Sequence, residues 1–390
     1  MFFKTFGWSF ALTAAAMIFA FIYGSWEALA ITGILIIIEI TLSFDNAIVN
    51  ARVLEGMNAF WRKMFLTVGI LIAVVGVRFA LPVILVSATT GLGATEVVRL
   101  AFENGDPHVE GTYGYYVLDA HPQLASLAGM FLLMLFFSWL FGEKEHAWIK
   151  PLEGPLGKLE GLTALPTILS LITLAIFAGA NPDRANDILI SGLIGLIAFL
   201  AIDTLSSLFE VEDENGESNG GAAVASTVGK AGFLGFMYLE FLDASFSMDS
   251  LGAGLAITSN IVILILGLGV GAIFVRSMTI YLVNSGSLNT YRYLESGAMW
   301  AIGALAFILF ISIKSHVPET VTGAIGIAFV GLAFLFSVLA NRRDKARGIE
   351  VEKITASDIH HPHHDVNLDP ALPKSHEGHA DASKSEPDTK

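Results

Sequence analysis

The sequence contains ten apolar segments, each close to the ~20 residues that a helix needs to cross ~30 Å of hydrocarbon. They occupy residues 7–24, 28–50, 64–88, 122–141, 163–180, 187–209, 226–257, 259–283, 297–315 and 319–340. Lipid offers the backbone no hydrogen-bond partners, so spanning segments of this length are helices. Only 15% of the 390 residues are charged, against about 25% in a soluble domain. The sequence therefore predicts an all-α, polytopic membrane protein with about ten transmembrane helices.

The lysines and arginines of the short loops predict the orientation of the chain in the membrane. Arg52, Arg62 and Lys63 follow the second segment, and a basic cluster at 342–347 follows the tenth. Both loops should be cytoplasmic, which puts both termini on the cytoplasmic side of a cell's inner membrane. The acidic segment 89–121 then lies outside, where it could collect cations.

Two copies of one polar motif interrupt the apolar segments. "EITLSFDN" at 39–46 aligns with "DASFSMDS" at 243–250: an acid, three residues, a serine, one residue, an aspartate and a small polar residue. The alignment pairs Glu39 with Asp243, Ser43 with Ser247, Asp45 with Asp249 and Asn46 with Ser250. The shared spacing indicates an internal repeat.

The repeat should be inverted, because the motifs lie in the second and the seventh segments and so run in opposite directions. Inverted repeats place a substrate site near the membrane midplane. An ionised acid there costs ~2.5–3.5 kcal/mol, so such acids usually mark an ion pathway. We expect 28–141 and 226–315 to form the inverted pair. The predicted cation ligands are Glu39, Ser43, Asp45, Asn46, Glu240, Asp243, Ser247, Asp249 and Ser250.

Helical spacing limits how these oxygens can converge. Glu39, Ser43 and Asn46 share one helical stripe, whereas Asp45 and its counterpart Asp249 point about 120° away. Either the motif helices are partly unwound or the aspartates serve a second site. The glycines in "SLGAGLAI" favour unwinding at the second copy, and the first copy has no such glycine.

Each motif is followed by an apolar segment with a single arginine, Arg78 or Arg276. These side chains could balance the carboxylates after the cation leaves, or they could extend to the membrane interface. The sequence leaves both readings open.

The two motifs resemble those of the TerC-like integral membrane proteins, within the LysE-like exporter superfamily. "LSFDNAIV" is similar to the first motif of that family and "LDASFSMDSLGAGLAITSN" to its second. The resemblance covers roughly 30–340, with departures at Gly252, where a proline is expected, and in the long loop 89–121. It implies efflux of a divalent metal, most often manganese, and a link to tellurite resistance.

Ligand chemistry agrees with a divalent cation as substrate. Carboxylate, amide and hydroxyl oxygens suit Mn²⁺, Mg²⁺ and Ca²⁺, and oxygens alone do not choose among them. No motif of a hydrolase or an ATP-binding loop is present, so we expect a secondary-active exporter, not an enzyme, with protons as the counter-ions. The alternative is a membrane scaffold subunit of a tellurite or metal-stress resistance complex, without transport of its own.

The sequence divides into an N-terminal transmembrane helix at 1–27, a transporter core at 28–340 and a disordered, His-rich cytoplasmic tail at 341–390. A signal peptide is an alternative for the first part, because "ALA" at 28–30 resembles a cleavage site. Beyond lipid and the metal ion, we expect no prosthetic group and no nucleic acid as a partner, and a homo-oligomer remains open. The tail histidines could bind metal or simply be solvated.

Overall fold

The computed structural model describes residues 2–142, 144, 146–159, 161–214, 221–315 and 317–346. The description leaves out the side chains of residues 2, 4, 206–231, 248, 249, 289 and 319. The predicted tail at 341–390 therefore lies almost entirely outside the described residues. Within the described ranges all regular structure is helical, as the apolar segments predict.

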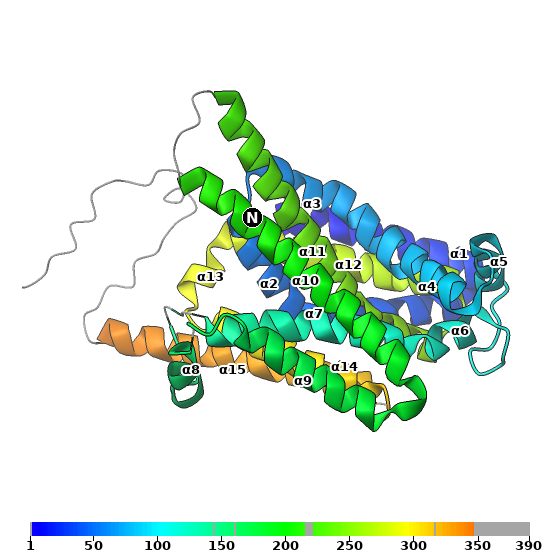
Figure 1. Ribbon diagram of the computed structural model, residues 1–390. Helices are drawn as coiled ribbons and strands as arrows, with labels where there is room; N and C mark the ends of the chain where they lie inside the picture. The colour runs from blue at the N-terminus through cyan, green and yellow to red at the C-terminus, as the bar shows by residue number, and fades with distance from the viewer. Residues whose placement is uncertain are drawn as a thin grey trace, which may run out of the picture.

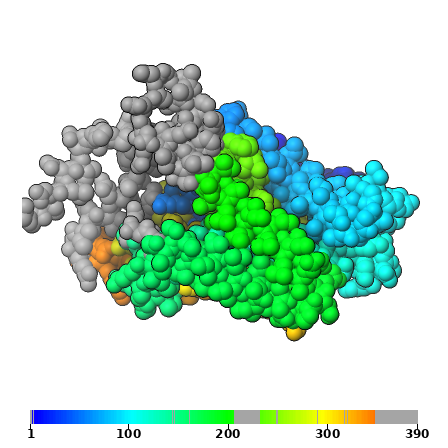
Figure 2. Space-filling view, viewed as in Figure 1, coloured from blue at the N-terminus to red at the C-terminus, as the bar shows by residue number. Residues whose placement is uncertain are grey.

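The helices follow one another through the chain with short connections. Their bounds are α1 (Phe2–Leu42), α2 (Phe44–Glu55), α3 (Ala59–Leu71), η1 (Ile72–Ala80), α4 (Leu81–Thr90), α5 (Ala94–Phe102), α6 (Tyr113–Asp119), α7 (His121–Phe141), α8 (Lys150–Gly157), α9 (Leu165–Ala180), η2 (Pro182–Arg184), α10 (Ala185–Glu214), α11 (Gly221–Ile257), α12 (Ile261–Ser285), α13 (Ser287–Thr290), α14 (Leu294–Ser312) and α15 (Glu319–Ala346). Figure 1 shows them as one elongated bundle, with α5 and α6 at one end and the last turns of α15 at the other. In Figure 2 the green helices α9 and α10 form the centre of the face toward the viewer, and blue and cyan segments form its right-hand part.

Seven helical stretches in the described part are long and apolar enough to cross a membrane. They are Thr5–Leu42, Ala59–Thr90, His121–Phe141, Pro182–Leu205, Ile261–Ser285, Leu294–Ser312 and Thr320–Ala346. Many of their side chains carry exposed apolar surface, which lipid covers at no cost. The chain is therefore a multi-pass membrane protein.

The stretch Thr5–Leu42 contains the first predicted segment and most of the second, because α1 is a hairpin. Gly24 and Ser25 have non-helical backbone angles, and Ser25 has a φ of 61°. A Cβ on Gly33 would lie 3.5 Å from Met17, although the two residues are 16 apart in sequence. Two residues this far apart along a straight helix would be separated by about 24 Å. The two arms of α1 therefore fold back on each other.

Contacts near the ends of helices join segments that the ten-span prediction puts on the same side of the membrane. The pairs are Asp119 with Arg184 and Tyr23 with Asn260 at one end, and Arg52 with Glu295 and Arg292 with Asp344 at the other. The first end is the predicted outer one, near α5 and α6, and the second is the predicted cytoplasmic one (Figure 1). The number of spans, their orientation and the inverted repeat stay predictions.

Glycines let α12 approach its neighbours closely at the centre of the bundle. A Cβ on Gly267 would lie 2.5 Å from the Cβ of Leu35, and one on Gly271 would lie 2.5 Å from the Cβ of Glu39. Small residues at helix contacts are common in membranes, where close backbone packing drives association. This packing brings the second arm of α1, which carries Glu39, against the helix that carries Arg276.

Candidate functional site

The two motifs meet in the interior of the bundle. Asn46 of the first motif donates a hydrogen bond from its amide nitrogen to the Oδ1 of Asp243 in the second, at 2.9 Å. Asn50 donates to the same oxygen at 3.0 Å. All three residues are buried. The structure therefore brings together side chains that are about 200 residues apart in sequence, as the repeat predicted.

A break in the first motif helix positions these side chains. The helix of α1 ends at Leu42, Ser43 has a φ of −102° and a ψ of 17°, and α2 begins at Phe44. The second motif lies inside α11, which is helical from Gly221 to Ile257. The expectation that glycines would unwind the second copy is therefore wrong. Gly252 and Gly254 are accommodated within the helix, and the interruption falls in the copy without glycine.

The acid of the first motif is bound by Arg78. The Nη2 of Arg78 donates to the Oε1 of Glu39, and its Nη1 donates to the carbonyl oxygen of Ala73 at 2.8 Å. The hydroxyl of Ser43 also donates to this carboxylate, at 3.2 Å. Arg78 lies in η1, a π-helical stretch in the third predicted segment. Non-α turns of this kind are frequent at functional sites.

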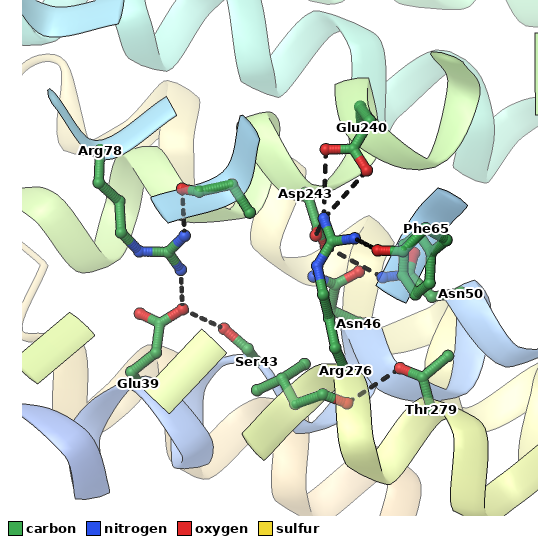
Figure 3. A network of polar contacts seen from close by, with 12 residues as sticks. Glu39, Ser43, Asn46, Asn50, Phe65, Arg78, Glu240, Asp243, Arg276 and Thr279 are labelled. Carbon is green, nitrogen blue, oxygen red and sulfur yellow. Dashed lines mark hydrogen bonds and ion pairs between the residues drawn. The ribbon is translucent and has the colours of Figure 1, made fainter. Parts of the chain in front are cut away.

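The acids of the second motif are bound by Arg276 in the equivalent way (Figure 3). Its Nη2 donates to the Oδ2 of Asp243 at 2.5 Å and to the two oxygens of Glu240 at 3.1 and 3.2 Å. Its Nη1 donates to the carbonyl oxygen of Phe65 at 2.6 Å, and the guanidinium lies 4.0 Å from the centre of the Phe65 ring. Gly69 makes room for this cluster, since a Cβ there would lie 2.3 Å from both Arg276 and Glu240.

Both arginines are inside the protein. Arg78 is 4% exposed and Arg276 is 1% exposed, so neither extends to the membrane interface. Of the two readings of these residues, the structure supports the one in which they balance the motif carboxylates.

A small polar cavity lies between the two clusters. Its volume is about 10 Å³, and it is lined by Glu39, Ser43, Asn46, Arg78, Asp243, Phe246, Ser247, Ala272 and Val275. Three of the lining residues place a buried oxygen without a hydrogen-bond partner among the described residues: Glu39 Oε2, Asn46 Oδ1 and Ser247 Oγ. A cavity of this size holds one water-sized particle.

Asp45 faces a different cavity. That cavity also measures about 10 Å³ and is lined by residues of α14 and α15, including Thr322 and Gly326, together with Leu42 of α1 and Phe246 of α11. Asp45 is buried, and its Oδ1 accepts a hydrogen bond from the backbone nitrogen of Asn46 at 3.0 Å. Helical spacing left open whether Asp45 converges with Glu39 on one ion or serves a second site. Because the two side chains line different cavities, the second site describes Asp45 better.

The remaining predicted ligands are only partly described. Ser250 is buried and donates to the carbonyl oxygen of Ser247 at 3.1 Å, so its hydroxyl is used within its own helix. The side chain of Asp249 lies outside the described residues. The prediction that Asp45 and Asp249 hold one ion therefore stays a prediction.

Asn50 is the site residue that the sequence analysis missed. It lies four residues after Asn46 and so continues the stripe of Glu39, Ser43 and Asn46 for one more turn. That spacing was the available signal. The repeat comparison did not include it because the aligned motifs end at Asn46 and Ser250.

The donor set suits a hard or borderline cation better than a soft one. In the described part of the chain, no group of three or more His, Cys, Asp or Glu side chains is arranged to hold a metal. The cavity instead combines two carboxylates with amide and hydroxyl oxygens. Such ligands are used for Mg²⁺, Ca²⁺ and Mn²⁺. With Glu240 included, three carboxylates face two guanidinium groups.

Comparison with known proteins identifies a family for most of the chain. The family model described as "Protein of unknown function (DUF475)" matches residues 44–344, which include both arginines, the whole second motif and the last three residues of the first motif, Phe44 to Asn46. Searches of the curated proteins and of the solved structures give no match. Because the model covers more than half of the sequence, the chain belongs to the DUF475 family of proteins of unknown function.

Proposed function

We propose that this protein is a secondary-active exporter of a divalent metal cation, with Mn²⁺ as the first candidate and protons as the counter-ions. The observation that carries the proposal is the cavity between the motifs, where Glu39, Asn46 and Ser247 each present a buried oxygen without a partner. Buried polar atoms are normally hydrogen-bonded. Three such oxygens from two halves of the chain, around a space for one small particle, favour a bound cation.

The charge balance of the cluster supports the same conclusion. Glu39, Glu240 and Asp243 carry three negative charges when ionised, and Arg78 and Arg276 carry two positive charges. The excess of one negative charge is costly in a membrane interior, so it attracts a cation or a proton. Exchange of the two at one site is the simplest form of antiport.

The arginines have a defined part in this mechanism. When the metal is absent, Arg78 and Arg276 neutralise the motif acids and keep the bundle closed around them. An entering divalent cation competes for the same carboxylates, because Arg276 and the cavity share Asp243. Metal binding then loosens the ion pairs that join the helices and favours a change of conformation. The choice of manganese rests on the resemblance to the TerC-like proteins, since oxygen ligands do not select among Mn²⁺, Mg²⁺ and Ca²⁺.

A second candidate function is a scaffold subunit of a tellurite or metal-stress resistance complex. The observation that favours it is that both buried ion pairs connect different helices: Arg78 to the second arm of α1, and Arg276 to α11. In that case the acids only hold the helices together. The two candidates differ in what removal of an acid does.

The test measures metal flux and melting temperature on the same proteins. Purified protein in proteoliposomes is given Mn²⁺, Ca²⁺, Mg²⁺, Zn²⁺ or Ni²⁺, with and without a pH gradient. Asp243→Asn keeps the shape and one acceptor oxygen while removing a charge, and Glu240 still pairs with Arg276. An exporter should lose Mn²⁺ flux in this variant while Tm changes little. Glu103→Gln, on an exposed loop residue, is the matched control and should change neither quantity.

Two outcomes would contradict the exporter. If the wild-type protein transports none of the five metals, either with or without a pH gradient, it has no such activity. Flux that falls in Asp243→Asn only in proportion to lost folded protein would favour the scaffold, since breaking a buried charge pair typically costs about 3–5 kcal/mol.

A further inference from the structure

A larger cavity lies on the other side of the first motif helix. Its volume is about 400 Å³, within the range of small-molecule sites. Its walls come from α2, α12, α14 and α15, and include Phe44, Ile48, Met278, Leu282, Val330 and Phe334. Nearly all of this lining is apolar, so the cavity cannot bind the cation of the proposed function.

The cavity is a groove open to the outside of the bundle. Phe44 and Phe334 are each more than one third exposed, and Gly331 is exposed. A Cβ on Gly331 would meet nothing within 4 Å, so this glycine faces the open space of the groove. The stretch of α15 that forms this wall lies in the membrane-crossing segment Thr320–Ala346. The groove therefore opens into lipid rather than into water.

Polar lining residues mark the end of the groove on the predicted cytoplasmic side, and basic residues lie beyond it on α15. Tyr291 lines it there, and its ring lies 4.7 Å from that of Phe334. Two contacts show that Tyr291 lies beside the last turns of α15. Arg292 pairs with Asp344, and Asn341 donates a hydrogen bond to the carbonyl oxygen of Thr290 at 2.8 Å. Exposed basic side chains occupy the same last turns of α15, namely Arg342, Arg343 and Lys345.

We propose that this groove binds an anionic phospholipid, with one acyl chain between α2 and α15 and the phosphate against the basic end of α15. An apolar slot that opens into lipid fits a hydrocarbon chain. Three exposed basic residues lie on the last turns of α15, and two of them, Arg342 and Lys345, are on the same helical face as Gly331 and Phe334. They fit a negatively charged headgroup, as basic pockets between membrane helices do in general. The complementary charge selects an anionic lipid over a zwitterionic one.

The site is placed to act on the motif helix. Phe44 and Ile48 contact the groove from the side of α2 opposite to Asn46 and Asn50, which bind Asp243. A bound acyl chain therefore fixes α2 from behind. This inference does not rest on metal export, because lipid binding can be measured whether or not the protein transports anything.

The first experiment compares two lipids with identical acyl chains on the full-length protein in detergent. After removal of co-purified lipid, phosphatidylglycerol should raise Tm by about 2 °C or more, and phosphatidylcholine should raise it less. Native mass spectrometry should show retained phosphatidylglycerol. Gly331→Phe fills the groove and should abolish the shift and the retained lipid. Gly179→Phe, at an exposed glycine of the apolar helix α9 that also faces open space, is the matched control and should keep both.

A separate variant tests whether the protein recognises the negative charge of the headgroup. Replacing Arg342, Arg343 and Lys345 together by glutamine should remove the preference for phosphatidylglycerol over phosphatidylcholine. Equal shifts with both lipids in the wild-type protein would overturn the assignment of an anionic headgroup. A full phosphatidylglycerol shift in Gly331→Phe would show that the lipid binds elsewhere.

A third measurement does not depend on the folding of a filled-groove variant. Phosphatidylglycerol with a photoactivatable group in its acyl chain should label the wild-type protein on α2, α12, α14 or α15 at the groove. Labelling confined to other helices would contradict the proposal. Because the chain has no cysteine, Gly331→Cys also tests a competing occupant. Rapid disulfide-linked dimer formation in lipid would show that a second copy of the chain covers the groove instead.

Discussion

At the scale of single residues, the charges of the motif acids are balanced inside the bundle. Arg276 supports two acids and one backbone carbonyl with a single guanidinium group, which a planar side chain with five N–H donors can do. The ammonium group of lysine has three donors around a point and cannot reproduce this arrangement. The identity of the residue therefore matters as much as its charge.

Arg276→Leu should be strongly destabilising, because it leaves Glu240 and Asp243 buried without their cation. The expected loss is about 3–5 kcal/mol in the free energy of unfolding, and Arg276→Lys should recover only part of it. Denaturant unfolding in detergent measures both. Arg99→Leu removes an exposed ion pair and should cost at most about 1 kcal/mol. Equal effects of Arg276→Leu and Arg99→Leu would show that the buried cluster does not hold the helices together.

Asp45 deserves a separate variant because it faces its own cavity against α15. If the ion path includes this second site, Asp45→Asn should abolish flux while Tm holds or rises, since the change removes an intramembrane charge with an insertion cost of ~2.5–3.5 kcal/mol. Flux and Tm of Asp45→Asn, Asp249→Asn and the double variant are the measurements. Undiminished flux in the double variant would remove both aspartates from the transport path.

At the scale of helices, close packing of α12 against the second arm of α1 sets the distance between the two motifs. Gly271 lies at this contact. A Cβ there would come within 2.6 Å of the Cβ and Cγ of Glu39 and within 3.2 Å of the backbone oxygen of Ile36. The backbone oxygen cannot rotate away as a side chain can, so any added atom must push the helices apart.

Gly271→Ala should therefore lower stability by about 1–3 kcal/mol, the usual cost of overpacking. Gly179→Ala is the control on α9, where a Cβ meets nothing within 4 Å. There the exchange should be neutral or stabilising by up to about 1 kcal/mol, because alanine favours the helix. Melting curves of the two variants in the same detergent make the comparison. A loss of similar size in both would mean that helix propensity, and not the contact with Glu39, is what matters.

At the scale of the whole molecule, the ends of the bundle are distinct. Basic residues gather where α15 ends, and the acidic segment around α5 and α6 lies at the other end (Figure 1). The contacts of Asp119 with Arg184 and of Tyr23 with Asn260 lie at the end near α5 and α6, and those of Arg52 with Glu295 and of Arg292 with Asp344 lie at the end where α15 finishes. This division agrees with the predicted even number of membrane crossings between Arg52 and the end of α15.

The absence of cysteine allows the topology to be tested with single introduced thiols. His108→Cys should react with a membrane-impermeant maleimide on intact cells, because the segment 89–121 is predicted to be outside. Asn58→Cys and Lys150→Cys should react only after the membrane is opened. Labelling of His108→Cys from the same side as Asn58→Cys would overturn the ten-span arrangement.

The sequence alone determined the class of this protein and the pairing of its motifs. Apolar length forces helices wherever the backbone enters lipid, and the described regular structure is all helical, with seven stretches long and apolar enough to cross a membrane. The shared spacing of "EITLSFDN" and "DASFSMDS" predicted that the two motifs would lie close together, and Asn46 of the first motif does bind Asp243 of the second. Both conclusions follow from patterns that are local in the chain.

Only the tertiary structure decided which of these polar groups share a cavity. Three features bring together the helix faces that carry Glu39, Asn46, Asn50 and Asp243. They are the break at Ser43, the π-helical stretch around Arg78 and the glycine contacts of α12. The same packing directs Asp45 toward α15 and draws the arginines inward. Helical periodicity tells which residues share a face of one helix, but the face that meets another helix depends on the fit of side chains distant in sequence. That fit has no local signature.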